Sequence, residues 1–407
     1  MTMRALYLGA ALLGAFTLAT AASGAGTSTP GVTPAEIVIG GTIPMTGVAS
    51  AYKTVGLGAS YYFKYVNAHG GVNHRKIRYI IKDDQYDPAQ TMDRTRELVE
   101  QDHVFAIFNS LGTEHNLATR PYLNALGVPQ LFVGSGGTTF GKDYKRWPWT
   151  IGYQPNYRAE GTIYGRYVAK KTPKARIAVL YQNDDYGKDL LAGLTKGLGK
   201  KAKQIVSKQS YDPTEPSVQS QVAKLKAAGA DTLMLFATPQ FAIQSYRYSY
   251  QLGWRPKVYV NVVSSASNIL KISELASSKK QVAGSISIVF LKDPTDPRWA
   301  KDPGIKLYRK IMKRYKDKGI DASDVYNVYG MSVAHTFVEA LKKAGKNPTR
   351  TSIVNAATHL TIRNDPFLLS GVIVKTTPTD HFPLDQARLE RWRSSRWVSF
   401  GGLFRVR

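Results

Sequence analysis

The chain has 407 residues, of which 43% are hydrophobic, and its 55 Lys and Arg against 29 Asp and Glu give a formal net charge of +26. This length and apolar content suffice for large buried cores and favour two lobes over one. The basic residues are spread along the chain, which argues against nucleic acid as a partner and predicts a solvated surface that mildly attracts anions. There is no cysteine, so disulfides are excluded.

The first 25 residues have the pattern of a secretory signal peptide. Arg4 precedes an apolar run over residues 5–18, and small residues follow through Ala25. The run is shorter than the roughly 20 residues that a membrane-spanning helix needs. We therefore expect a cleavable signal peptide over residues 1–25 and export to the periplasm, without cysteine acylation as a lipoprotein.

Strands and helices alternate over residues 35–152. The pattern predicts strands at 37–43, 78–82, 104–108 and 128–133, and helices at 56–67 and 115–126. Asp87 followed by Pro88 is typical of a helix start and predicts a further helix. Parallel strands joined by helices are the expected arrangement.

The same alternation restarts after residue 150. Helices are expected at 157–171, 186–200, 218–228 and 241–252, and strands at 176–181, 205–206, 232–236 and 258–262. The last third predicts a strand at 285–290, long helices at 305–316 and 325–343, a short helix at 351–357 and an antiparallel hairpin over 386–400. The fold class is thus α/β, with two doubly wound, Rossmann-like lobes and a ligand cleft at their seam.

Two loops of small and polar residues follow predicted strands, at residues 109–113 and 134–138. Ligands of parallel α/β sheets bind at the carboxyl ends of strands, where hydroxyls and free backbone N–H groups at helix starts can hold an anion. Neither loop offers a nucleophile with a base, and the seven histidines lack metal-ligand spacing. We expect no catalysis, no metal and no cofactor.

Several motifs, taken in order, resemble the periplasmic ligand-binding proteins of branched-chain amino acid ABC transporters. They are the run from Gly41 to Gly47, Gly70-Gly71-Val72, Asp83-Asp84, Asp87-Pro88, Asp185-Tyr186-Gly187 and the two loops. The resemblance implies a type I periplasmic binding protein fold, with two lobes joined by a three-strand hinge. Lobe 1 would comprise residues 35–152 and 286–366, and lobe 2 residues 153–285 and 367–407.

The resemblance also implies a function and a site. The protein would be the monomeric solute-binding component of an ABC importer, which captures an amino acid or another small organic carboxylate and delivers it to the permease subunits. The loops would hold the carboxylate, rings would cover the ligand, and Arg158 could pair with an acid. The expected ligand-binding residues are Tyr52, Ser110, Leu111, Gly112, Thr113, Ser135, Gly136, Gly137, Thr138, Arg158, Tyr186, Thr238, Val263 and Ser264.

One departure from the family pattern bears on the ligand. Amino acid binders of this family carry an acidic residue after a strand of lobe 2 that pairs with the ligand's ammonium group, whereas residues 260–265 of this chain contain no carboxylate. Burying an ammonium without a counter-charge costs several kcal/mol. The ligand is therefore either a branched-chain or related amino acid, as in the family at large, or an aromatic or other organic acid without an amine. A sensory protein that presents its ligand to a membrane receptor would share the fold.

Overall fold

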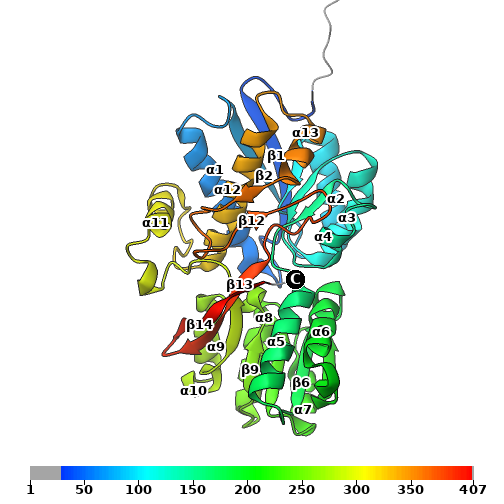
Figure 1. Cartoon of the computed structure of the whole chain (residues 1–407), viewed down its shortest axis with the longest axis vertical. Coiled ribbons are helices and arrows are strands. Elements are labelled where there is room, and N and C mark those ends of the chain that lie inside the picture. The colour runs from blue at the N-terminus through cyan, green and yellow to red at the C-terminus, as the bar shows by residue number, and fades with distance from the viewer. Residues whose placement is uncertain (1–28, 406–407) are drawn as a thin grey trace, which may run out of the picture.

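The computed structural model describes residues 29–405, which form two lobes, one above the other in Figure 1. The predicted signal peptide, residues 1–25, lies outside the described residues. Within residues 29–405, no helix combines the length and the apolar character needed to cross a membrane.

The first lobe is built on a five-stranded parallel sheet with the order β2-β1-β3-β4-β5. Its strands are β1 Glu36–Ile43, β2 Lys76–Asp83, β3 Ala106–Phe108, β4 Gln130–Val133 and β5 Thr150–Gly152. Strand β1, which pairs with a neighbour on each side, is buried from Ile37 to Ile43, as is usual for a parallel sheet covered by helices on both faces. The alternation predicted for residues 35–152 is confirmed.

The helices of this lobe come from two distant parts of the chain (Figure 1). They are η1 Ser50–Tyr52, α1 Lys53–Ala68, α2 Pro88–Arg96, η2 Glu97–Gln101, α3 Thr113–Ala125 and α4 Thr139–Lys142, and from the later segment η5 Pro297–Trp299, α11 Pro303–Tyr315, α12 Val325–Ala344 and α13 Arg350–Ala357. The side chain of Asp87 accepts a hydrogen bond from the backbone of Ala89, so α2 begins where the sequence predicted. A short antiparallel pair, β11 Thr361–Ile362 and β12 Val374–Lys375, follows α13.

Glycines let α1 and α12 approach closely. A Cβ atom on Gly58 would lie 2.4 Å from the carbonyl oxygen of Asn327, and one on Gly330 would lie 2.1 Å from that of Val55. Neither position has room for a side chain. The close approach brings Tyr52, just before α1, against Tyr326 at the start of α12, with ring centroids 5.3 Å apart.

The second lobe is built on a seven-stranded sheet with the order β14-β13-β10-β9-β8-β6-β7. Its strands are β6 Ile177–Gln182, β7 Ile205–Tyr211, β8 Thr232–Phe236, β9 Lys257–Val260, β10 Ile286–Val289, β13 Gln386–Arg393 and β14 Arg396–Arg405. The predicted carboxyl-terminal hairpin is confirmed as β13 and β14, which extend the otherwise parallel sheet by antiparallel pairing with β10.

The helices of the second lobe are α5 Tyr157–Lys171, α6 Asp185–Leu198, η3 Gly199–Gln204, α7 Gln219–Ala227, α8 Pro239–Gln251, η4 Val262–Ser264, α9 Ser267–Ala276 and α10 Lys279–Val282. Glycines again set the closest packing. A Cβ on Gly161 of α5 would lie 2.1 Å from the carbonyl oxygen of Leu190, and one on Gly193 of α6 would lie 2.1 Å from that of Arg158. The two helix backbones are therefore in direct contact.

Two of the crossings between the lobes lie at other points than those expected. Strand β10 lies in the second sheet, so residues 286–289 belong with the second lobe and not with the first. Phe367 packs edge to face on Tyr62 of α1, and His381 accepts a hydrogen bond through its backbone from Gly152. Residues after 366 thus remain on the first lobe nearly to the start of β13. The local sequence of a strand or of a surface segment carries no signal of the lobe that it joins when its partners are distant in the chain.

Candidate ligand-binding site

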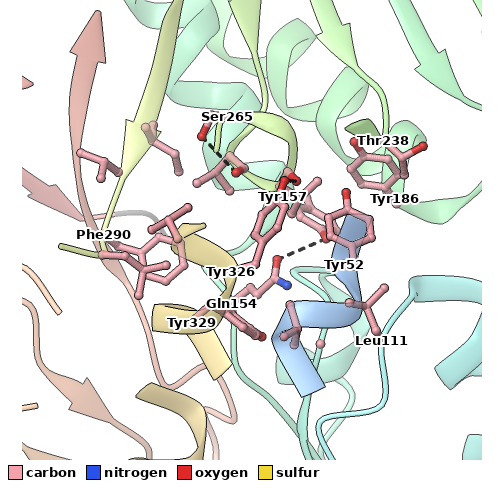
Figure 2. Close-up of a pocket in the computed structure, with 18 of the residues that line it drawn as sticks. Tyr52, Leu111, Gln154, Tyr157, Tyr186, Thr238, Ser265, Phe290, Tyr326 and Tyr329 are labelled. Atoms are coloured by element: carbon pink, nitrogen blue, oxygen red, sulfur yellow. Dashed lines mark hydrogen bonds between the residues drawn. The ribbon is translucent and has the colours of Figure 1, made fainter. Parts of the chain in front are cut away.

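A cavity lies between the two lobes. The first lobe contributes Tyr52, Val55, Tyr86, Leu111, Gly112, Thr113, Gly134, Val325, Tyr326 and Tyr329; the second contributes Tyr157, Tyr186, Thr238, Val262, Val263, Ser265, Ser267, Ile288, Val289, Glu390 and Trp397; and the crossing segments contribute Gln154, Phe290, Leu291 and Asp293. Figure 2 shows Leu111, Tyr186 and Thr238 at one side of this interlobe cavity and Phe290 at the other.

Aromatic rings dominate the walls of the interlobe cavity. Tyr157 and Tyr186 pack edge to face with their centroids 5.0 Å apart, because the close packing of α5 on α6 brings the first turns of these helices together. Tyr52 and Tyr326 form the matching pair of the first lobe. Together with Phe290, these rings can enclose an apolar or aromatic ligand body.

The loop at residues 109–113 brings the start of α3 to the cavity. Leu111, Gly112 and Thr113 line it, and Gly112 has a φ of 107°, which a residue with a side chain rarely adopts. No side chain caps α3, so its first backbone N–H groups have no side-chain partner there. The Thr113 hydroxyl shares a 2.8 Å hydrogen bond with Ser135 of the second loop. A helix start of this kind suits a carboxylate.

The loop at residues 134–138 already binds a carboxylate, which belongs to the protein itself. The backbone N–H of Thr138 donates a 2.7 Å hydrogen bond to Asp189 Oδ2, while Arg158 donates to Asp189 Oδ1 at 2.8 and 3.1 Å. Asp189 lies on α6, so this contact joins the lobes. Arg158 is paired within the protein and does not line the cavity.

The structure divides the predicted site residues into two groups. Those that line the cavity are Tyr52, Leu111, Gly112, Thr113, Tyr186, Thr238 and Val263. Those that do not are Ser110, Ser135, Gly136, Gly137, Thr138, Arg158 and Ser264. Ser110 accepts a hydrogen bond from the Thr42 backbone at 3.0 Å, and Ser264 donates to the Ala237 carbonyl at 2.5 Å. Direct ligand contact by any member of either group stays a prediction.

Several cavity residues escaped the sequence analysis, among them Tyr86, Tyr157, Tyr326, Tyr329, Gln154, Phe290, Trp397, Asp293 and Glu390. The sequence does carry a signal for Tyr157 and Tyr326. Like Tyr186, which lies two residues after the cap Asp184, they lie one residue after the cap Asn156 and two residues after the cap Asp324. A tyrosine in the first turn of a capped helix is therefore the shared pattern.

The hydroxyl of Tyr52 is buried in the cavity wall and has no hydrogen-bond partner among the described residues. The hydroxyl of Tyr186 differs, since it donates to the side-chain oxygen of Asn261 at 2.9 Å when that amide is oriented to satisfy its neighbours. A buried hydroxyl without a partner costs free energy. Tyr52 can therefore donate a hydrogen bond to an oxygen of a bound molecule.

The charge distribution around the cavity is unusual. Among residues 29–405, no Lys or Arg lines it, and residues 260–265 contribute no carboxylate, whereas Asp293 and Glu390 do. Beneath the lining residue Val262 lies Glu160, whose Oε1 accepts hydrogen bonds from the Val262 backbone at 2.8 Å and from Tyr164 at 2.6 Å. Burial raises the pKa of Glu160 to about 7. In residues 29–405, no cluster of three potential ligands is placed to hold a metal ion.

Hydrogen bonds cross from lobe to lobe around the cavity. The hydroxyl of Tyr326 donates to the Val263 carbonyl at 2.7 Å, and the backbone N–H of Asp185 donates to Glu114 at 2.9 Å. With the Thr138–Asp189 contact, these bonds join the two lobes around the cavity. A ring-rich cavity between two lobes that are bridged in this way is the arrangement of a two-lobed ligand-binding protein.

Comparison with known proteins identifies the family. The model of the periplasmic binding protein family matches residues 36–396, and the chain belongs to this family. It is similar to the Leu/Ile/Val-binding protein homolog 1 of Brucella abortus (strain 2308), with 24% identity over 328 residues, 77% of this chain and 80% of the Brucella protein.

Two solved structures illustrate the fold. A branched-chain amino acid ABC transporter protein from Thermus thermophilus with bound valine matches with a TM-score of 0.79 at 17% identity, covering 91% of this chain and 96% of that one. A solute-binding protein of an ABC transporter from Rhodopseudomonas palustris BisB5, in complex with 3,4-dihydroxybenzoic acid, matches with a TM-score of 0.73 at 19% identity, covering 91% and 98%. The predicted type I periplasmic binding protein fold is confirmed.

Proposed function

We propose that this protein is the extracytoplasmic solute-binding component of an ABC importer, which captures a small carboxylate-bearing ligand between its lobes and delivers it to the permease. The observation that carries the proposal is the interlobe cavity, in which the uncapped start of α3 faces rings from both lobes. Family membership supports the transport role. A cleavable signal peptide over residues 1–25 and a periplasmic location complete the proposal.

The ligand carboxylate binds at the start of α3. Three kinds of donor serve it: the backbone N–H groups of the first turn, the hydroxyl of Thr113 and the unpartnered hydroxyl of Tyr52. Oriented backbone dipoles can stabilise an anion without a cationic side chain, and no Lys or Arg lines the cavity. The apolar part of the ligand then lies among Tyr157, Tyr186 and Tyr326.

Ligand capture is coupled to closure. The hydrogen bonds that cross between the lobes exist only in the closed arrangement, and a ligand that touches both walls stabilises the same arrangement. The free energy of these contacts therefore adds to the free energy of ligand binding. The permease would recognise the closed form.

A branched-chain amino acid is the ligand class that the named relatives suggest, whereas the walls of the cavity favour an acid without an α-amine. Residues 260–265 provide no carboxylate beside the proposed carboxylate site, and burying an unpaired ammonium costs several kcal/mol. The ring-rich lining suits an aromatic acid, and one structural relative was solved with 3,4-dihydroxybenzoic acid.

A thermal-shift screen tests the proposal. Leucine, valine and isoleucine are compared with benzoate, phenylacetate, cinnamate and short aliphatic acids. At a hundredfold excess over its dissociation constant, a ligand stabilises the folded protein by about 2.7 kcal/mol. We expect stabilisation by at least one acid without an amine. Stabilisation by leucine or valine alone would refute the amine-free ligand, and no stabilisation by any carboxylate would refute carboxylate capture.

A control variant separates cavity binding from adsorption to the basic surface. Tyr186→Ala removes a ring from the cavity wall, whereas Tyr250→Ala removes a ring that is 43% exposed on α8. Cavity binding predicts that only Tyr186→Ala abolishes the shift. Equal loss in both variants, or loss of the shift at high salt alone, would indicate adsorption.

A further inference from the structure

Glu390 is a buried carboxylate that the proposed capture of a ligand carboxylate does not use. It lies on β13, is 5% exposed, and lines both the interlobe cavity and a smaller neighbouring cavity. Among the described residues its side chain has no hydrogen-bond or ion-pair partner within bonding distance. A carboxylate is seldom left in this state, because a buried polar group without a partner costs free energy.

The neighbours of Glu390 do not satisfy it. Asp293 is an acid as well, and its oxygens already accept hydrogen bonds from Thr295 and Ser267. The charge of Arg298 acts on Glu390 and lowers its pKa, but Arg298 pairs with Asp296 and half of its side chain is exposed. Burial and the charge of Asp293 raise the pKa of Glu390 above its ordinary value. The group therefore needs a donor that the protein does not supply.

Glu390 reaches the cavity from β13, beside β10. It pairs with Ser287 across β13 and β10, and β10 leads directly into the lining residues Val289 and Phe290. Figure 2 shows Phe290 across the cavity from Leu111, which belongs to the loop at the start of α3. A ligand whose carboxylate binds at α3 therefore extends its other end toward Glu390.

We propose that Glu390 and Asp293 form a second recognition subsite, which binds a hydrogen-bond-donating group, a hydroxyl or an ammonium, at the end of the ligand remote from its carboxylate. This inference rests on the proposed function, because it takes the carboxylate at α3 as the first anchor. The ligand is then an elongated acid with a polar far end. An α-amino group, which lies next to the carboxylate, does not reach this subsite.

The two donor groups leave different signatures. A hydroxyl can bind the protonated carboxyl of Glu390 without a change in charge. An ammonium binds the ionised form and lowers the pKa of Glu390, so a proton held on the carboxyl passes to the buffer as the ammonium binds. Calorimetry in two buffers of different ionisation enthalpy detects this release, which accompanies an ammonium and not a hydroxyl.

The test uses two matched probe sets. The first is 3-phenylpropanoate with its 4-hydroxy and 4-aminomethyl derivatives, and the second is hexanoate with 6-hydroxyhexanoate and 6-aminohexanoate. With the wild-type protein we expect at least one donor-bearing probe to bind tenfold or more tightly than its parent acid. Glu390→Leu should abolish this preference, and Glu390→Gln should abolish it for the ammonium probe. Glu339→Gln, which changes a partly exposed acid on α12 outside the cavity lining, should keep it.

The outcomes distinguish the two proposals. If the parent acids bind but no derivative binds more tightly, or if Glu390→Leu keeps the preference, the subsite is refuted and carboxylate capture stands. If none of the six binds although an acid of the thermal-shift screen does, the subsite is refuted and carboxylate capture stands. If no carboxylate of either set binds, carboxylate capture is refuted and the subsite with it. Glu390→Leu is expected to fold, because replacing an unpaired buried carboxyl by an apolar group removes a desolvation cost.

Discussion

Tyr326→Phe removes a single hydrogen bond between the lobes. The hydroxyl of Tyr326 in α12 donates to the Val263 carbonyl at 2.7 Å, and the ring stays packed on Tyr52 when only the oxygen is lost. A neutral hydrogen bond contributes about 1 kcal/mol, and the unpaired carbonyl left behind adds up to about 1 kcal/mol more. Since the bond exists only in the closed form, the dissociation constant should rise about 5- to 30-fold.

Calorimetry with the carboxylate that gives the largest thermal shift measures this change. The matched control is Tyr246→Phe, which removes a 2.8 Å hydrogen bond to Ser285 within the second lobe. We expect both variants to lose a similar amount of stability and only Tyr326→Phe to lose affinity. Equal affinities of the two variants would refute the role of this contact in closure.

Closure itself can be followed because the chain has no native cysteine. Leu126, which is 52% exposed on the first lobe, and Leu275, which is 87% exposed on the second, can each be replaced by cysteine and labelled for energy transfer. At saturating ligand, Tyr326→Phe should lower the closed fraction relative to the labelled parent. An unchanged closed fraction with weaker binding would assign the hydroxyl to ligand contact instead.

Three further predictions concern the site and its support. Thr113→Val should weaken carboxylate binding tenfold or more, because a hydrogen bond to a charged group is worth about 1.5–3 kcal/mol. Thr138→Val should change the affinity little, since Thr138 Oγ1 accepts a hydrogen bond from Asn156. Titration calorimetry of both variants tests this difference. Gly161→Ala should lower the free energy of unfolding by about 1–3 kcal/mol or more, because the added Cβ clashes with the Leu190 backbone. Gly402→Ala should leave it unchanged, since a Cβ there meets nothing within 4 Å. Equal free energies of unfolding for both variants in denaturant would contradict this. The pKa of Glu160 is about 4.5 in the unfolded chain and about 7 in the folded protein, so between these pH values the folded state binds more protons. The free energy of unfolding should therefore fall as pH rises through this window, by up to about 3 kcal/mol. Glu160→Gln should flatten this dependence in melting curves taken from pH 4 to 8.

The order of strands and helices was predictable because each element has a local pattern. Asp87 and Pro88 mark the start of α2. Apolar residues on both sides of a turn, with Trp392 before it and Trp397 after it, predicted the hairpin of β13 and β14. The loops at 109–113 and 134–138 were found because each follows an apolar strand. Strand β10 was assigned to the wrong lobe because its partners, β9 and β13, are distant in the sequence.

The composition of the cavity could be predicted only in part. Tyr52, Thr113 and Tyr186 were reached through the resemblance, whereas Phe290 and Glu390 come from segments that meet only after both lobes have folded. The sequence alone shows that residues 260–265 contain no carboxylate. The carboxylate that does line the cavity, Glu390, stands in a strand whose pattern is that of an ordinary half-buried hairpin.

The most direct test of the central claim is closure of the doubly labelled protein on a carboxylate and on its uncharged analogue. The acid with the largest thermal shift is titrated beside the corresponding carboxamide, which has the same shape without the negative charge. If the start of α3 binds a carboxylate and the lobes close on it, energy transfer rises with the acid and not with the amide. Equal closure with both compounds, or no closure with either, would contradict the account.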